Sequence, residues 1–295
     1  MNIIDENILK KQIADWIVSL GSIEVKRLLG LKRYRIRDSK SGLETYIAMN
    51  ILFSKSDHKT IKGFYRELTK YKENVDIWGS FPTYERFIVN INRCGLLVKR
   101  FLEMHLDDLE QGQGYIDSTK IETSRPYWFG KTHRYNGSCR GYSSTGEFMG
   151  LKLHAVINNK GSLLRFSLTD GKTHDLTPIK NGLLAGLVGK LYGDSGYVSR
   201  DIYFGLMSQN LFLFAKPRKT SLEDSDLGIG HIVDWTINHS KQYRKRQRIE
   251  RYFYRLKNIY NLVVNKTKSK ASLLTRIFSA MLASQLDCLG LFKYK

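Results

Sequence analysis

The feature that most constrains the fold is the apolar pattern of residues 114–215. Two stretches in which apolar and polar residues alternate, 151–157 and 162–168, flank the short polar turn Asn158–Gly161. This arrangement predicts two antiparallel strands. The other elements that the pattern predicts here are strands at 115–118, 190–193 and 211–215 and helices at 176–187 and 199–209. Hairpin strands followed by alternating helices and strands indicate a mixed sheet flanked by helices.

The residues before this region have a helical period. Their apolar side chains recur every three or four positions over residues 5–20, 43–53, 61–68 and 83–106. The first helix is predicted to begin at the N-cap Asp5 and to stop at Gly21. The polar, acidic, glycine-containing segment 107–114 then marks a domain boundary. We therefore expect an α+β protein, with an all-α domain at residues 1–108 and a mixed-sheet domain at residues 109–295 that includes a C-terminal helix.

The helices at 43–53 and 61–68 are joined by a short polar turn. Two helices around such a turn are typical of a DNA-reading helix-turn-helix, and equally of an ordinary helical hairpin in a small bundle. The turn contains no glycine, which favours the hairpin.

Charge limits the kinds of partner that the chain can have. The 295 residues include 48 Lys and Arg against 28 Asp and Glu, a net charge of +20, and such an excess favours a polyanionic partner, above all nucleic acid. Half of the excess lies in residues 216–276, which hold 15 basic and 5 acidic residues. The hydrophobic content of 42% is enough for a core and excludes wholesale disorder.

Cysteine usage and hydropathy indicate a cytoplasmic protein. Cys94, Cys139 and Cys288 are far apart and form no CxxC pair, so neither a disulfide framework nor a zinc ribbon is expected. The first residues mix charges with apolar side chains, unlike a signal peptide. The most apolar late stretch, 277–292, is interrupted by polar residues and is too short to cross a membrane.

Three carboxylates are predicted where such a sheet places its sites. Asp117 ends the first predicted strand, Asp194 directly follows the strand at 190–193, and Glu250 lies on a long basic helix. Functional groups of α/β sheets gather at strand ends. Oxygen ligands from distant parts of the chain suit Mg²⁺, with Mn²⁺ as a possible substitute.

The segment around Glu250 has the most specific pattern. Its spaced residues are Tyr243, Arg246, Glu250 and Lys257. On one continuous α-helix these positions fall within an arc of roughly 60°, so they are expected on one face. The carboxylate can then hold a metal while the neighbouring cations bind DNA phosphates. Arg244 and Arg248, on the same segment, are further expected DNA contacts.

These motifs resemble those of the DDE transposases of bacterial insertion sequences, whose third catalytic segment reads Y-x2-R-x3-E-x6-K. The resemblance covers nearly the whole chain. Blocks similar to those of the family follow in order at residues 115–119, 150–154, 168–175 and 193–197. Residues 64–67 and 81–87 are most similar to the insertion-sequence family nine-eight-two.

The resemblance implies an RNase H-like fold in which Asp117, Asp194 and Glu250 are the catalytic, metal-binding triad. It implies two metal ions, cleavage of double-stranded DNA at transposon terminal inverted repeats, and joining of the freed ends to target DNA. A homodimer or larger synaptic complex is expected, with residues 1–108 as the helical DNA-binding and assembly domain and residues 109–295 as the catalytic domain. No nucleotide cofactor is expected, and the chain has no G-x-x-x-x-G-K-[ST] loop. The alternatives are a metal-dependent nuclease that does not join DNA, and a non-catalytic, domesticated DNA-binding protein, against which the intact triad argues.

Several residues near the motifs have structural interpretations. Asp175, before Leu-Thr-Pro, is predicted to be a helix N-cap rather than a metal ligand. Lys152 and His154 share one strand face, where a solvated Lys and a structural His are as plausible as functional ones. The aromatic residues 252–254 are expected to pack against the sheet.

Two basic segments are further candidates for DNA contacts. The loop 131–140 fits either a mobile phosphate clamp or a long solvated connection. The basic turn 266–270, which precedes an amphipathic helix at 273–291, is interpreted as a phosphate-binding segment.

Overall fold

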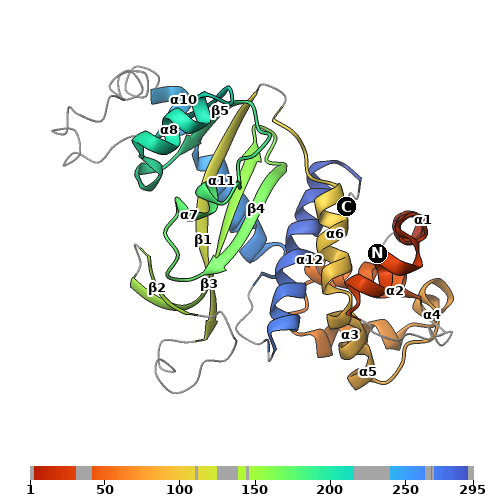
Figure 1. Cartoon of the computed structure of the whole chain (residues 1–295). Coiled ribbons are helices and arrows are strands. Elements are labelled where there is room, and N and C mark those ends of the chain that lie inside the picture. Colours follow the sequence, from red (N-terminus) through yellow and green to blue (C-terminus); the bar gives the residue numbers. More distant parts are fainter. Residues whose placement is uncertain are drawn as a thin grey trace. The chain divides into compact units, whose positions relative to one another are not determined.

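The computed structural model divides into two compact units (Figure 1). One, the helical unit, comprises Met1–His105 and Arg255–Lys295, and the other, the sheet unit, comprises Leu106–Tyr254. The structure describes residues 3–30, 42–109, 112–124, 139–143, 146–215, 240–262, 267 and 269–291. Each unit is described below by itself.

The sheet unit contains a six-stranded mixed sheet. Its strands are β1 (Gln113–Ser124), β2 (Cys139–Ser143), β3 (Gly146–Asn158), β4 (Leu163–Asp170), β5 (Gly189–Gly193) and β6 (Leu211–Ala215). β3 pairs antiparallel with β1, β2 and β4, whereas β5 pairs parallel with β1, and β6 pairs parallel with β5. Antiparallel strands that continue into parallel strands through helical crossovers form the RNase H-like arrangement, which confirms the predicted α+β class.

The hairpin that the alternating pattern predicts is present. β3 and β4 pair antiparallel from Leu151↔Asp170 to Ile157↔Leu163, and the Asn158 backbone N–H donates to the Ser162 carbonyl at 2.9 Å. Gly161, in the turn, has φ 87°, a conformation that glycine adopts at little cost. The strand prediction therefore holds at this hairpin.

β1 is longer than the predicted strand at 115–118. It pairs with β3 from Gly114↔Asn158 to Ser124↔Met149, because ladder bonds continue through the polar stretch that follows Asp117. Asp117, opposite Ala155, therefore lies within β1 and not at its end as predicted.

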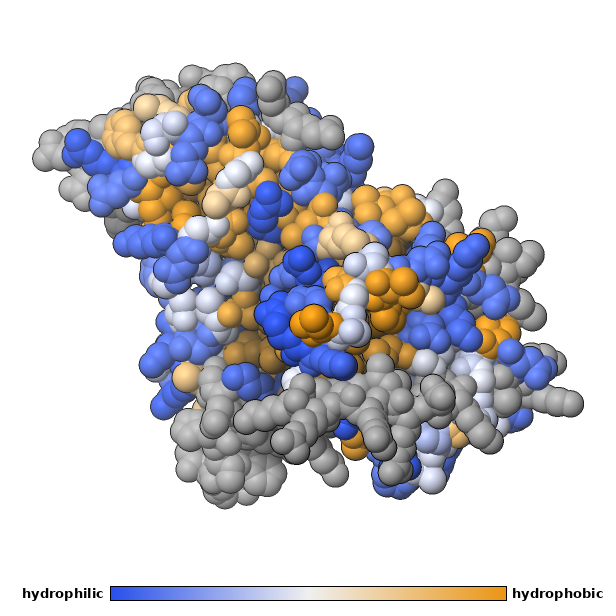
Figure 2. Space-filling view, turned by 45° about the vertical axis from the view of Figure 1, so that its right-hand side comes forward, coloured by the Kyte–Doolittle hydropathy of each residue, from blue (hydrophilic) through white to orange (hydrophobic). Residues whose placement is uncertain are grey.

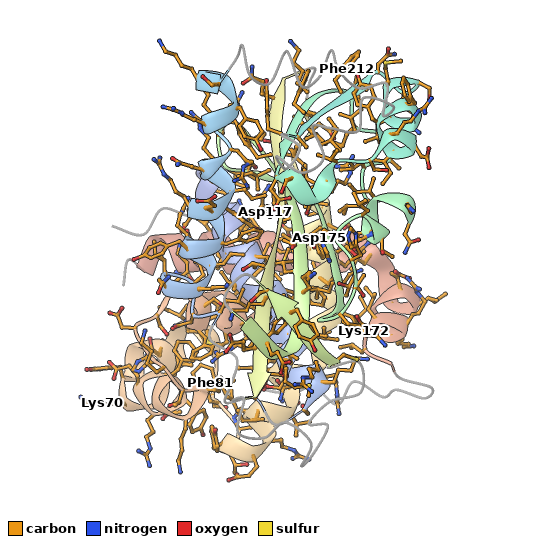
Figure 3. The ribbon with its side chains drawn as sticks, turned by 90° about the vertical axis from the view of Figure 1, so that its left-hand side faces the viewer. Lys70, Phe81, Asp117, Lys172, Asp175 and Phe212 are labelled. Carbon is orange, nitrogen blue, oxygen red and sulfur yellow. The ribbon has the colours of Figure 1, made fainter. Side chains whose placement is uncertain are left out.

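Helices cover both faces of the sheet. On one face, Ile116 and Val156 join a buried apolar cluster with Ile179, Ile202 and Leu206. The last three belong to α7 (Thr177–Lys180) and α8 (Arg200–Met207). On the opposite face lies the first part of α11 (Gln247–Asn258), whose residues up to Tyr254 belong to the sheet unit (Figure 3).

The predicted helix at 176–187 is wrong beyond Lys180. α7 has Pro178 in its first turn, and the chain then follows a series of turns. Gly182 and Gly186 have φ of 88° and 76°, which an α-helix cannot accommodate. The strands at 190–193 and 211–215 and the helix at 199–209 match β5, β6 and α8 within one or two residues.

The helical unit is built around two buried helices. Its helices are α1 (Ile3–Leu28), α2 (Leu43–Lys55), α3 (Ile61–Lys70), α4 (Lys72–Trp78), α5 (Tyr84–Arg93), α6 (Gly95–Met104) and α12 (Lys270–Cys288). α2 is buried continuously over Thr45–Ser54. α12 packs beside α6 and α2 (Figure 1) and is buried from Thr275 to Gln285 on every side.

The helix boundaries differ from the predictions at three places. α1 already includes Asp5, which is therefore not its N-cap, and at Gly21 it kinks, with φ 73°, before resuming. The predicted helix at 83–106 is two helices, because the chain turns at Cys94. α4 was not predicted.

The C-terminal helix belongs to a different unit from the one expected. The sequence places it in the catalytic domain as an amphipathic helix, but α12 groups with the N-terminal helices and has no exposed polar face over its central turns. Two of its buried polar side chains are hydrogen-bonded: the Ser279 hydroxyl donates to the Thr275 carbonyl, and Gln285 donates to the His105 carbonyl. The Arg276 guanidinium lies over the Phe53 ring, 3.9 Å from its centroid.

Among the described helices, none is long and apolar enough to cross a membrane. On the face shown in Figure 2, hydrophilic residues are spread widely, with apolar residues between them.

Candidate functional site

Asp117 is more deeply placed than Glu250 among the predicted site carboxylates. It lies within β1, and its side chain is 19% exposed. Its Oδ1 accepts a hydrogen bond from the Ser118 backbone N–H at 2.8 Å. Burial raises the pKa of Asp117 to about 7, and the negative charges of Asp194 and Asp175 add to this effect. The ionised form of Asp117 is therefore disfavoured in this environment, even with the Arg246 guanidinium nearby.

Asp194 follows β5 directly, as the sequence predicts. Its side chain caps the short 3₁₀ helix η2 (Ser195–Tyr197), because Oδ1 accepts from the Gly196 backbone N–H at 2.8 Å. β5 lies next to β1 in the sheet, and this neighbourhood brings the Asp194 charge close enough to raise the pKa of Asp117.

Glu250 lies in the first turn of α11. Its side chain is 56% exposed, and Oε1 is 3.6 Å from the Arg246 guanidinium. The same guanidinium lies 3.7 Å from Asp117 Oδ2. Arg246 thus links two of the three predicted triad residues, one on the sheet and one on the helix that covers it.

Tyr243 lies on a separate helix from Glu250, which corrects the expectation of one continuous helix. α10 (Ser240–Arg244) ends before Arg246, and the bond from the Arg246 N–H to the Tyr243 carbonyl tightens the chain into a turn. The Tyr243 hydroxyl donates to the Gly193 carbonyl at 2.9 Å. This hydrogen bond attaches α10 to the end of β5, next to Asp194.

The remaining predicted DNA contacts lie in different places. Arg244 is exposed. Arg248 donates to the Asn159 carbonyl in the β3–β4 turn and so fastens the start of α11 to the sheet. Lys257 lies on α11 two turns after Glu250, in the residues that group with the helical unit, so the sheet unit does not bring it together with the others.

Asp175 does not have the N-cap role that the sequence predicts, and it lies beside Ser118, the residue after Asp117. It does not cap α7, whose N-cap is Leu176 with no side-chain cap bond. Instead its Oδ1 accepts from the Ser118 hydroxyl at 2.8 Å and lies 3.2 Å from Lys152 Nζ. The Asp175 side chain is 28% exposed, against 19% for Asp117.

The side chains around Asp175 are buried rather than solvated. Lys152 also donates to the Thr173 carbonyl at 2.8 Å, so it is not the solvated lysine considered above. His154 is fully buried, and its Nε2 bonds the Thr169 hydroxyl at 2.9 Å. Burial lowers the pKa of His154 to about 4, which keeps the ring neutral. These residues form a polar layer on the Ser118 face of the sheet.

Tyr197 lies near the same aspartates and was not among the predicted site residues. It is buried in η2, and burial together with the charges of the three aspartates raises the pKa of its hydroxyl well above the usual value. Only its position, three residues after Asp194, gave a signal in the sequence.

The aspartates repel one another, and a divalent cation bound between them would relieve this repulsion. A cation between Asp117 and Asp194 would supply positive charge that stabilises the ionised form of the buried carboxylate. Carboxylate oxygens are the preferred ligands of Mg²⁺. Among the described residues, no group of three or more His, Cys, Asp or Glu is arranged to hold a metal ion. Glu250 is paired with Arg246 and would have to turn toward the aspartates to join them.

The other sequence hypotheses have mixed outcomes. Of the aromatic residues 252–254, Tyr252 and Phe253 are buried, but Tyr254 is exposed, so it does not pack as expected. Most of the loop 131–140, and residues 266 and 268 of the basic turn, lie outside the described residues.

Comparison with known proteins identifies the sheet unit. A family model described as "Transposase DDE domain" matches residues 108–270. A solved structure titled "Cryo-EM structure of piggyBac transposase synaptic complex with hairpin DNA (SNHP)" is similar, with 12% sequence identity and a TM-score of 0.41. The match covers 75% of this chain and 52% of that one, so the chain spans about half the length of this neighbour.

The search of curated proteins finds no match. The family model, by contrast, covers more than half of the chain and includes Asp117, Asp194 and Glu250. The chain therefore belongs to the transposase DDE domain family.

Proposed function

We propose that this protein is a DDE transposase that cuts double-stranded DNA at the ends of its own element and joins the freed ends to target DNA. Family membership supports the transposase function at a coarse level. The observation that carries the finer proposal is geometric: Asp117 lies on β1, next to the strand that Asp194 follows, and the Arg246 guanidinium lies 3.7 Å from Asp117 and 3.6 Å from Glu250.

Asp117 and Asp194 would hold Mg²⁺ or Mn²⁺, and Glu250 would complete the ligand set. Two such ions, when bound, activate the attacking oxygen and stabilise the leaving oxygen of a phosphodiester. Tyr243 and Arg248 hold the covering helices on the sheet through their bonds to Gly193 and Asn159.

Arg246 has a distinct role in the proposal. Its guanidinium lies between Asp117 and Glu250. A guanidinium binds phosphate as readily as carboxylate and in a bidentate manner. We expect Arg246 to transfer from the carboxylates to a DNA phosphate when the substrate binds, which releases Glu250 for the metal site.

The proposed partners are the terminal inverted repeats of the element and a target duplex. Because two ends must be cut and joined together, a homodimer or larger synaptic complex is proposed. The net charge of +20 supports a DNA partner through release of counterions from the phosphates. The resemblance to the insertion-sequence family nine-eight-two stays a prediction.

Nicking of an end-bearing duplex tests the proposal. The wild-type protein with Mg²⁺ should nick a labelled duplex that carries the element's end, and Asp194→Asn should lose at least a hundredfold in rate while binding the duplex normally. The exposed Asp201 of α8 provides the matched control, and Asp201→Asn should nick as the wild type does. Full activity of Asp194→Asn would exclude Asp194 from the chemistry.

A further inference from the structure

The exposed face of α5 forms a groove in the helical unit that the catalytic site does not use. The groove has a volume of about 570 Å³. Its lining residues are Thr83, Glu85, Arg86, Val89, Asn90 and Arg93. Among the described residues, these six come from α5 or from the residue just before it.

The opposite side of α5 is firmly held. Phe87 and Ile91 are buried, and the Phe87 ring packs against those of Tyr46 and Tyr65. The Asn50 amide of α2 donates to the Ile91 carbonyl at 3.2 Å. Because one face is fixed in the core, the other face is presented as a rigid surface.

The residues of the exposed face fall in one stripe. Arg86, Val89 or Asn90, and Arg93 are three or four positions apart, which places them above one another on a helix. The stripe from Arg86 to Arg93 is about 10 Å long at 1.5 Å per residue, which corresponds to roughly three base pairs.

The chemistry of this stripe fits DNA. Arg86 and Arg93 are exposed, and among the described residues neither guanidinium has an ion-pair or hydrogen-bond partner. Val89 lies between them with 51% of its surface exposed. Arg pairs with guanine, Asn with adenine, and a small apolar side chain contacts the thymine methyl group in the major groove.

A protein partner fits the stripe less well. The centres of protein interfaces are depleted of charged side chains, whereas here two cations flank a single valine. The carboxylate of Glu85 is compatible with DNA, since Glu accepts a hydrogen bond from the cytosine amino group. It would also repel phosphates if the helix were placed differently along the duplex.

We propose that α5 enters the major groove of duplex DNA and reads about three base pairs through Arg86, Val89, Asn90 and Arg93. This inference rests on the proposed function in that the sequence read would be part of the element's end. It assigns sequence recognition to α5, and not to the helices at 43–53 and 61–68 considered from the sequence. The buried α2 is unsuited to such a contact.

Selection from a pool of random-sequence duplexes tests the proposal. The full-length protein in EDTA, where no cleavage occurs, should enrich a motif. The double variant Arg86→Gln with Arg93→Gln should enrich the same motif with about three positions lost, and should bind the wild-type motif at least tenfold more weakly. Both changes are on exposed side chains, so folding should be unaffected.

The control removes the same charge from another helix of the unit. Lys26→Gln with Arg27→Gln, in the last turn of α1, should leave the motif intact and weaken binding only slightly. The proposal is overturned if the wild-type protein enriches no motif, or if the α5 variant keeps every position of it. Because binding is measured without metal, a failure of DNA cleavage would not affect either result.

Discussion

Burial of Asp117 lowers the free energy of unfolding at neutral pH, because the ionised carboxylate is poorly solvated in the folded protein. A carboxylate whose pKa rises from 3.8 to about 7 on folding binds its proton more tightly in the folded than in the unfolded state. Its contribution to stability is therefore complete below its ordinary pKa and is lost as the pH rises through 7. The protein accepts this cost at neutral pH, as expected of a group kept for binding a cation.

Asp117→Asn should remove this pH dependence. Between pH 5 and pH 7 in EDTA, the free energy of unfolding of the variant should improve by about 2 kcal/mol relative to wild type, because each unit of pKa shift corresponds to about 1.4 kcal/mol. Urea denaturation followed by circular dichroism measures it, with Asp201→Asn as the control. A constant difference between variant and wild type across this pH range would contradict the assignment.

Asp175 shows what single-residue reasoning from sequence misses. The local sequence favours an N-cap, but the partners of its carboxylate, Ser118 and Lys152, come from strands β1 and β3. Contacts over such separations leave no local signal. By contrast, a strand end marks Asp194 and a spaced motif marks Glu250, whereas the strand end predicted at Asp117 lies further along the chain, at Ser124.

Asp175→Asn should weaken metal binding and lower stability together. The change removes a negative charge near Asp117 and leaves Lys152, 13% exposed, without its carboxylate, at an expected cost of about 2 kcal/mol. Asp170→Asn is the matched control, since Asp170 accepts from Thr173 at 2.6 Å. Calorimetric titration with Mg²⁺ and urea denaturation would report both effects, and equal results for the two variants would refute a role for Asp175 in the site.

At the scale of elements, contacts between distant segments set boundaries that the local sequence pattern does not predict. The polar stretch after Asp117 predicts the end of a strand, yet pairing with β3 continues it to Ser124. The spaced motif predicts one helix from Tyr243 to Lys257, yet the bond of Tyr243 to Gly193 accompanies a turn before α11. Elements with a clear period, such as β4, β6 and α8, were predicted almost to the residue.

Tyr243→Phe should loosen the attachment of α10 to β5. Loss of one hydrogen bond to a backbone carbonyl is expected to cost about 1 kcal/mol, and the displacement of α10 should slow DNA nicking several-fold. Tyr142→Phe, at an exposed tyrosine of β2, is the control. If nicking by Tyr243→Phe equals that of wild type, the hydrogen bond does not position the site.

At the scale of the whole molecule, the sequence predicts two kinds of unit but not which unit the C-terminal helix joins. The pattern of helical periods followed by strands predicted both kinds of unit, with a boundary within a few residues of Leu106. It could not predict that α12 would join the N-terminal helices. The burial of that helix against α6 and α2 is decided by packing between distant segments.

Salt dependence of DNA binding should separate the basic residues by their contacts. Arg244→Gln should reduce the slope of log Kd against log salt by about 1, the value for one phosphate contact. Arg248→Gln should change the slope less, since Arg248 already donates to the Asn159 carbonyl. Fluorescence anisotropy at several salt concentrations measures this, and equal changes in slope would show that Arg248 also binds phosphate.

Strand transfer tests the central claim most directly. The protein is incubated with Mg²⁺, a precut duplex bearing the element's end, and a plasmid target, and covalent joining is detected by sequencing across the junction. We predict joined products for the wild-type protein and none for Asp117→Asn, Asp194→Asn or Glu250→Gln. No joined product from the wild-type protein, under conditions in which it nicks an uncut end, would contradict the claim and identify a nuclease. Joining by any of the three variants would contradict the proposed triad.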